Sequence, residues 1–419
     1  MRYSLAAGLV ALAAGASAKT PCPKPPTANP IERVDIGVRP GFLVDDMDEG
    51  PLKDKLQECL ESPDPLKASL LSVAHRGGGT LQIPEHSVQS AMAGARMGAG
   101  ILECDVAFTK DRELVCRHSQ CDLHYTTNIV AIPELNAKCT KPFTPADGDT
   151  PADALCCTSD LTLAEFRKLC ATMEGSNPKA TTPEEFIDTP PSWRTDLYST
   201  CGTVLSLQDH IALTVSLGLK HTPELKTPEV EMPFEGDYTQ EDYAQQLIDE
   251  YKEAGIPAED VFLQSFLYDD ILYWLQADPE FGAQAMFLDS YGETPETFPD
   301  AIANLTTYAA DGVKYLAPPI PYLLSAKDGK VVPSEYANKA VELGFKIVAW
   351  SLERSGRLAD VKANGNYYYM YFADAINNDG DVYNVVDVMV REIGIVGLFS
   401  DWSATVTFYA NCFGIGLLD

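Results

Sequence analysis

Basic residues are scarce in this 419-residue chain: 31 Lys and Arg stand against 61 Asp and Glu, which gives a formal net charge of −30 at pH 7. A surface with this excess of negative charge repels the phosphate groups of nucleic acids and of anionic lipids. Binding to nucleic acid is therefore not expected. The acidity is interpreted as a means of staying soluble in an acidic or extracellular setting.

Long apolar runs are also missing, because no segment reaches the ~20 residues that a membrane-spanning helix needs. The N-terminal run, from Leu5 to Ala14, follows Arg2 and precedes the small residues of segment 16–18. This arrangement predicts a secretory signal peptide, residues 1–18, and no transmembrane segment. We therefore expect a secreted protein, with the cell wall or the vacuole as alternative destinations.

CxxC pairs are absent among the eleven cysteines, which argues against a structural zinc site. In a secreted protein most cysteines form disulfides, and an odd number leaves at least one unpaired within the chain. Cys104 is expected to be the free one, because it alternates with Glu103 and Asp105 and so faces the outer layer of the protein. One sequon, at Asn304, allows a single N-glycan.

Apolar runs of strand length alternate with amphipathic segments after a proline-rich N-terminal extension, residues 19–65, that is predicted to be irregular. The runs are 70–74, 100–108, 113–117, 217–225, 261–266, 284–288, 313–316, 345–351 and 395–400. The clearest helical segments are 87–99, 238–255, 269–277, 334–344 and 383–394. Repeated strand–helix units predict an α/β fold with a parallel sheet.

The length and the number of units favour a (β/α)8 TIM barrel, residues 66–419, over an open doubly wound sheet. Nine runs are one too many, and the run 113–117 is the candidate for a hairpin partner. Residues 120–210 interrupt the alternation and hold six of the eleven cysteines. Since a structureless loop of that length is unusual, we expect a Cys-rich insertion over one face of the barrel, stapled by at least two disulfides.

Seven ionisable side chains stand in or directly after these apolar runs: His75, Arg76, Glu103, Asp105, His118, Glu224 and Lys226. The two acidic residues of segment 103–105 are two positions apart, so both point to one side of their strand. In a barrel the carboxyl ends of the strands surround the active site, where all seven are expected to meet. For one such residue alone, a core histidine or a solvated strand face is the simpler interpretation.

The residue types in this set suit one kind of chemistry. Three carboxylates at one point repel one another unless a hard cation lies between them, and oxygen ligands suit Ca²⁺ or Mg²⁺. Arg and Lys beside a cation suit a phosphate group, and two histidines suit a general acid and a general base. The set therefore predicts metal-dependent cleavage of a phosphodiester.

The same residues stand in motifs that resemble those of the glycerophosphodiester phosphodiesterase family. Segment 74–127 has the family's order of HRG, PE followed by His and Ser, ExD, TKD, a strand ending in His, and TT. The later motifs are TPELK at 222–226, VFLQSF at 261–266, IVAWSL at 347–352 and VGLFSDW at 396–402. The resemblance extends from about residue 71 to 403 and is greatest to the periplasmic, calcium-dependent branch.

The resemblance implies a TIM barrel that hydrolyses small-molecule glycerophosphodiesters to glycerol 3-phosphate and an alcohol. It implies that a divalent cation, Ca²⁺ in preference to Mg²⁺, binds to Glu103, Asp105 and Glu224. His75 and His118 match the acid–base pair. Arg76 and Lys226 match the phosphate contacts. Trp350 matches the aromatic residue beside the glycerol, with core packing as the alternative, and Glu85 matches a residue that orients the first loop.

Two departures from the family pattern are the large insertion and Ser119, which follows His118 where the family usually has Asp. Two other functions are alternatives. The first is a phospholipase D-like enzyme acting on lysolipid or sphingolipid head groups, but no amphipathic lipid-binding stretch is evident. The second is a catalytically silent secreted binding or cell-wall protein, but none of the matching histidines or metal ligands has been lost. The sequence does not indicate the oligomeric state.

Overall fold

The computed structural model describes residues 30–187, 189–198 and 201–418. Its centre is a closed barrel of parallel strands, because β1 pairs with both β2 and β15 and so joins the two ends of the sheet. The eight barrel strands are β1 (Ser69–Ala74), β2 (Ala99–Phe108), β8 (Lys220–Leu225), β9 (Gln264–Ser265), β10 (Met286–Leu288), β11 (Tyr315–Ala317), β14 (Lys346–Leu352) and β15 (Gly397–Ser400). The predicted TIM barrel is confirmed.

The ninth apolar run is a hairpin partner, as expected. Strand β3 (Leu114–Cys116) folds back on β2 in antiparallel pairing and takes no part in closing the barrel. A second hairpin, β12 (Leu324–Lys327) with β13 (Lys330–Pro333), lies between β11 and β14 in the sequence. Neither hairpin changes the order of the eight parallel strands.

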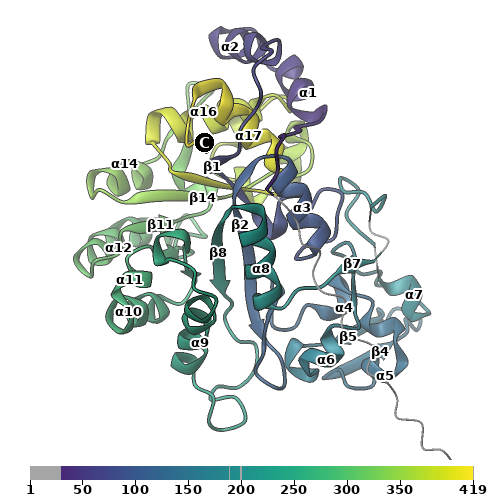
Figure 1. Ribbon diagram of the computed structural model, residues 1–419. Helices are drawn as coiled ribbons and strands as arrows, with labels where there is room; N and C mark the ends of the chain where they lie inside the picture. The colour runs from purple at the N-terminus through teal and green to yellow at the C-terminus, as the bar shows by residue number, and fades with distance from the viewer. Residues whose placement is uncertain (1–29, 188, 199–200, 419) are drawn as a thin grey trace, which may run out of the picture.

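Helices surround the barrel, as Figure 1 shows. The longer ones are α3 (Val88–Arg96), α8 (Leu207–Leu217), α9 (Gln240–Glu253), α10 (Tyr268–Ala277), α12 (Phe298–Ala310), α14 (Glu335–Glu342), α16 (Asp381–Asp387) and α17 (Ser403–Phe413), with short turns α11 (Pro279–Gly282), α13 (Ile320–Leu323) and α15 (Val361–Asn364). Side chains of Ser87, Ser206, Thr239 and Ser334 accept hydrogen bonds from first-turn N–H groups, which explains where four of these helices begin. Within the described residues, no helix is long and apolar enough to cross a membrane.

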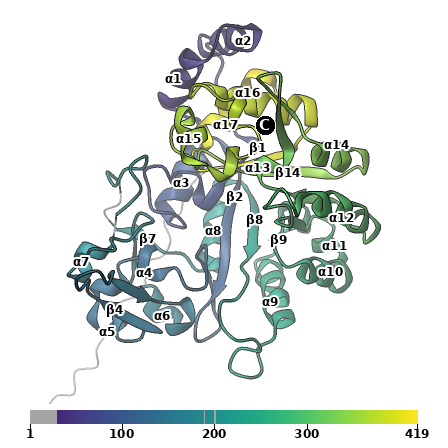
Figure 2. The same ribbon diagram turned by 180° about the vertical axis from the view of Figure 1, so that it is seen from behind.

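The prediction of an irregular extension is wrong for the part that the structure describes. Residues 30–65 contain α1 (Arg39–Asp46) and α2 (Pro51–Leu60), each with a proline at its first or second position, where the missing N–H costs nothing. The two helices pack beside α16 and α17 in both views (Figures 1 and 2). A disulfide between Cys59 and Cys412 ties α2 to α17. The predicted signal peptide, residues 1–18, lies outside the described residues.

The insertion forms a body of its own on the side of the barrel that carries α3 and α8 (Figures 1 and 2). Its elements are α4 (Leu123–Thr126), α5 (Pro133–Asn136), β4 (Lys141–Thr144), β5 (Asp153–Leu155), α6 (Leu163–Phe166), β6 (Cys170–Ala171), α7 (Pro183–Phe186) and β7 (Gly202–Thr203). They enclose a separate apolar core that includes Ile129, Leu161 and Phe166. The disulfides Cys121–Cys157, Cys139–Cys156 and Cys170–Cys201 staple the insertion, which confirms that prediction.

Removing the Cys59–Cys412 disulfide (C59A/C412A) is expected to lower the free energy of unfolding by about 3 kcal/mol more than removing Cys139–Cys156 (C139A/C156A). The two disulfides span 353 and 17 residues, and a cross-link that closes a longer loop removes more entropy from the unfolded chain. Urea titrations of both double variants against the parent protein measure the difference. Equal losses would show that native-state packing, not chain entropy, governs these disulfides.

Candidate active site

The acidic residues come from two neighbouring strands. In β2, Glu103 and Asp105 alternate with Cys104, so the carboxylates point into the barrel and the sulfur points outward. Strand β8 pairs with β2 in a register that sets Glu224 beside Asp105. Oxygens of Glu103, Asp105 and Glu224 lie within 4.8 Å of one another, and all three residues are buried. The structure therefore brings the three predicted carboxylates together.

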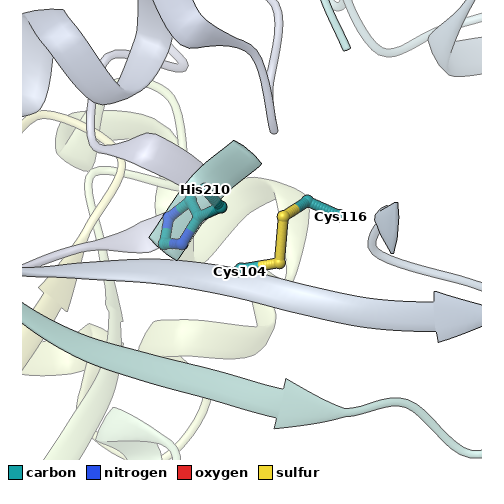
Figure 3. A group of neighbouring side chains, drawn as sticks. All are labelled: Cys104, Cys116 and His210. Atoms are coloured by element: carbon teal, nitrogen blue, oxygen red, sulfur yellow. A yellow bond between two sulfur atoms is a disulfide. The ribbon is translucent and has the colours of Figure 1, made fainter. Parts of the chain in front are cut away.

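The prediction that Cys104 is the free cysteine is wrong. Its side chain does face the outer layer, but it forms a disulfide with Cys116 of β3. Because β3 folds back on β2, Cys116 lies on the same outer side of the sheet. Figure 3 shows the His210 ring of α8 beside this disulfide. With five disulfides in the structure, ten cysteines are paired, and the eleventh, Cys22, lies outside the described residues.

Glu103 is held from two sides. One carboxylate oxygen accepts a hydrogen bond from the backbone N–H of Arg76 at 2.6 Å, and the other accepts one from the Gln264 amide at 3.0 Å. Burial, together with the nearby carboxylates of Asp105 and Glu224, nevertheless raises the pKa of Glu103 well above its usual value. Two hydrogen bonds do not offset the cost of a third negative charge in this enclosed space.

Asp105 and Glu224 differ in their charge state. Burial favours the neutral form of both, but Lys226 and His86 hold the pKa of Asp105 well below its usual range. His86 Nε2 donates to Asp105 Oδ2 at 2.7 Å, and Lys226 Nζ lies 2.5 Å from Glu224 Oε1. Burial raises the pKa of Glu224 to about 8, even though Lys226 acts in the opposite direction. The three acids therefore share less than three negative charges near pH 7.

The first loop holds Arg76 in a strained position. Arg76 has φ of 52°, in the left-handed region, and its Nη1 lies 2.8 Å from Glu85 Oε2. The next residue, Gly77, has φ of 103°, and a Cβ there would come within 2.5 Å of Ser90 Oγ in α3. The turn after His75 therefore needs glycine. Arg117, which is fully buried, donates to the backbone carbonyl of Glu85 and holds the far end of this loop.

His75 is oriented by Asp401, which directly follows β15. His75 Nδ1 lies 2.5 Å from Asp401 Oδ1, while its Nε2 lies 3.4 Å from Ser351 Oγ. The other oxygen of Asp401 contacts Arg194 at 2.6 Å and Arg354 at 3.0 Å. Burial lowers the pKa of His75, although the Asp401 carboxylate acts in the opposite direction. A neutral His75 that donates through Nδ1 can accept a proton at Nε2.

His118 lines the same cavity as His75. Burial, Arg76 and Lys226 together lower the pKa of His118 well below its usual value. Ser119, which stands where the resembling family has Asp, bonds through its backbone N–H to Asp122 at 3.2 Å. Asp122 thus supports the loop after His118 through the backbone of Ser119. This contact holds the loop, but it does not hold the imidazole ring of His118.

A small cavity opens at this end of the barrel. Trp350 lies in its wall, half-buried, and its indole N–H donates to the Ala317 carbonyl at 2.8 Å. The ring of Phe266 packs against it edge to face. The lining residues are His75, Arg76, Glu103, His118, Glu224, Gln264, Phe266, Leu288, Trp350, Ser351, Tyr368 and Phe399. Every predicted site residue thus lines the cavity or directly contacts a residue that does.

Four charged residues near His75 were not predicted from the sequence: Glu174, Arg194, Arg354 and Asp401. Asp401 lies within the motif VGLFSDW, which could have pointed to it as a strand-end acid. Glu174 and Arg194 belong to the insertion, where no local pattern marks them. Arg354 follows the end of β14 by two residues, in a loop without a recognisable motif.

Comparisons with known proteins show which family the chain resembles and which solved structures share its fold. The model of the glycerophosphoryl diester phosphodiesterase family matches residues 75–404. An Arthroderma benhamiae protein named "Extracellular protein" is 51% identical over 245 residues, which are 58% of this chain and 100% of that one. A solved Silicibacter pomeroyi structure assigned to the same family name is 16% identical, covers 87% of this chain and 98% of its own, and has a TM-score of 0.51.

A second solved structure, from Agrobacterium tumefaciens and with the same assignment, is 15% identical. It covers 82% of this chain and 97% of its own, with a TM-score of 0.50. At these identities the two structures support the fold alone.

The buried His210 should make stability depend on pH. Burial, with a smaller effect of His221, lowers the pKa of His210 to about 3, whereas an unfolded histidine titrates near about 6.5. The unfolded chain therefore binds the extra proton first. Above about pH 6.5 the proton uptake of His210 costs no stability. As the pH falls below that value, the free energy of unfolding decreases by up to about 1.4 kcal/mol per pH unit.

Urea unfolding of the parent protein and of His210→Phe, from about pH 7 to 4.5, tests this expectation. The variant should gain stability relative to the parent as the pH falls, because phenylalanine cannot bind a proton in the unfolded chain. A difference between the two proteins that stays constant over this range would contradict the assignment.

Proposed function

The chain belongs to the glycerophosphoryl diester phosphodiesterase family, and on that premise we propose that it is a secreted, cation-dependent enzyme that releases glycerol 3-phosphate and an alcohol from small glycerophosphodiesters. Its place among the phosphodiester hydrolases follows from the family. The finer proposal is carried by one observation: three buried carboxylates and two histidines with lowered pKa values gather around one cavity.

We assign the cation site to Glu103, Asp105 and Glu224. The oxygen Asp105 Oδ1 is buried and has no hydrogen-bond donor among the described residues, which suits a cation. The raised pKa values of Glu103 and Glu224 indicate a cluster that becomes fully charged only beside a positive ion. Oxygen donors suit Ca²⁺ or Mg²⁺, and the sequence resemblance favours Ca²⁺. Such an ion would neutralise charge on a phosphate oxygen.

We assign phosphate binding to Arg76 and Lys226. Arg76 uses one terminal nitrogen for Glu85, while its Nε is buried and has no hydrogen-bond partner among the described residues. Lys226 Nζ lies between the Glu224 carboxylate and the face of the Phe266 ring. Trp350 would then support the glycerol part of the substrate with its ring face.

We assign the proton transfers to His75 and His118. His75 donates to Asp401 through Nδ1, so its Nε2 is the base that takes the proton from the attacking hydroxyl. The family resemblance suggests that this hydroxyl is the glycerol 2-hydroxyl, with water following. His118 is the acid. A bound phosphate would offset the positive charge of Arg76 and Lys226, so the His118 pKa would rise and the ring could hold the proton that it gives to the leaving alcohol.

Secretion is supported by two observations beyond the predicted signal peptide. The structure contains five disulfides, which persist in oxidising compartments. A relative of 51% identity carries the name "Extracellular protein". We therefore propose that the enzyme acts on diesters outside the cell.

Removal of the cation is expected to abolish hydrolysis of glycerophosphocholine, and Ca²⁺ is expected to restore it better than Mg²⁺.

Asp105→Asn should remove Ca²⁺ binding measured by calorimetry, because it replaces the ionised member of the cluster. Glu113→Gln, which alters an acidic residue two positions before Val115 on the hairpin, is the matched control and should bind Ca²⁺ normally. Full activity after exhaustive chelation would contradict the cation assignment.

His75→Ala and His118→Ala are each expected to lower kcat by roughly 10²–10⁴-fold, the usual contribution of a general acid or base. His124→Ala is the control, because His124 belongs to the insertion and does not line the cavity. Choline release from glycerophosphocholine under saturating substrate measures kcat for all three variants. If either cavity histidine can be removed with kcat near that of His124→Ala, its role as acid or base is wrong.

A further inference from the structure

We propose that Glu174 and Arg194, both in the insertion, are positioning residues of the active site that hold Asp401 and, through it, His75. This inference rests on the proposed function, because it assumes that His75 transfers protons. It gives the insertion a part in the chemistry itself, whereas the sequence suggested only a disulfide-stapled cover over one face of the barrel.

The two residues lie in one covalently closed loop. Cys170, in β6, and Cys201, which directly precedes β7, form a disulfide, and the two strands pair antiparallel beside it. Glu174 and Arg194 stand between these cysteines in the sequence. The closed base fixes where the loop starts and ends, and the loop then reaches Asp401, which is 207 residues from Arg194 in the sequence.

The side chains form a ring of alternating charge. Arg194 contacts Asp401 at 2.6 Å and Glu174 at 2.7 Å. Arg354, from the loop after β14, contacts the same two acids at 3.0 Å and 2.8 Å. Two positive and two negative groups therefore close on themselves, with the side chains of Arg194 and Asp401 only 2% and 0% exposed.

The ring needs all four members. Arg194, Arg354 and Arg76 lie near one another, and Glu174 contacts the first two while its second oxygen is 3.6 Å from Arg76. Without Glu174, Arg194 and Arg354 would share the single carboxylate of Asp401. Without Arg194, Arg354 would be the only arginine left to compensate the fully buried charge of Asp401. Because buried charges that are poorly compensated are costly, this loss would destabilise the arrangement.

The ring bears on catalysis through the geometry of Asp401. Its Oδ2 is occupied by the two arginines, so Oδ1 alone faces His75. That arrangement fixes both the rotation of the carboxylate and the tautomer of His75, with the proton on Nδ1 and Nε2 left as the acceptor. A freely rotating Asp401 would lose this selection even if every residue that touches the substrate remained.

The test compares Arg194→Met, Arg194→Lys and Glu174→Gln with Arg167→Met. Arg167 is also in the insertion and forms an exposed ion pair with Asp209, so it is a matched control for loss of an arginine. We expect Arg194→Met to lower kcat for glycerophosphocholine by about 10–100-fold, part of what a general base supplies, with KM changed less than about threefold. Lysine should recover part of kcat, because it reaches one carboxylate but not two in a fork.

A second readout is the imidazole proton on His75 Nδ1, observed by NMR and assigned with His75→Ala. Its downfield resonance should persist in Arg167→Met and weaken or shift in Arg194→Met and in Glu174→Gln. Glu174→Gln keeps the shape of the side chain, so it tests the ring even if Arg194→Met does not fold.

An Arg194→Met protein with kcat equal to that of Arg167→Met, or with an unchanged His75 resonance, would overturn the proposal. So would a loss confined to KM, which would place Arg194 in substrate binding. The NMR readout does not depend on turnover. A parent protein without diesterase activity would therefore contradict the proposed function, while a His75 resonance unaffected by the ring variants would contradict only this inference.

Discussion

Strand β2 is buried along all ten of its residues and still carries Glu103 and Asp105, and the architecture around it follows from the need to compensate that charge. An ionised carboxylate inside a barrel is unstable unless it has a cation or hydrogen-bond donors. The chain supplies the Arg76 backbone N–H and Gln264 for Glu103, and it supplies His86 for Asp105. With these partners the cluster still has more carboxylates than positive charges. A bound cation would compensate this excess of negative charge.

The glycine-rich first loop is a consequence of the same constraint. To donate its backbone N–H to Glu103, Arg76 must turn back over the strand end, and it adopts a left-handed conformation to do so. The following Gly77 passes α3 so closely that no side chain fits. The sequence HRGG therefore combines a catalytic candidate, a backbone donor and the turn that lets both reach the barrel mouth.

Much of this could be predicted from the sequence, because it depends on local patterns. Alternation along a strand showed that Glu103 and Asp105 point the same way, and the order of strand–helix units gave the barrel. The free-cysteine prediction failed although the orientation of Cys104 was right, because its partner faces the same side only after the hairpin has folded. Asp401 and Arg194 meet across 207 residues, a distance over which no spacing rule operates.

Both additions to the barrel act on the loop after β14. Arg39 of helix α1 pairs with Glu353, whose side chain is 4% exposed and whose φ of 63° places it in the left-handed region. The next residue, Arg354, pairs with Glu174 of the insertion and with Asp401. The N-terminal helices are in turn fixed to α17 by a disulfide, and the insertion loop is closed by another. Without these additions, Glu353 would lose its ion-pair partner Arg39, and Arg354 would keep only Asp401. In this chain Glu353 pairs with Arg39 and Arg354 pairs with Glu174, and both partners belong to segments that a disulfide anchors. These pairs keep the loop after β14 in one arrangement, and with it Asp401 and His75.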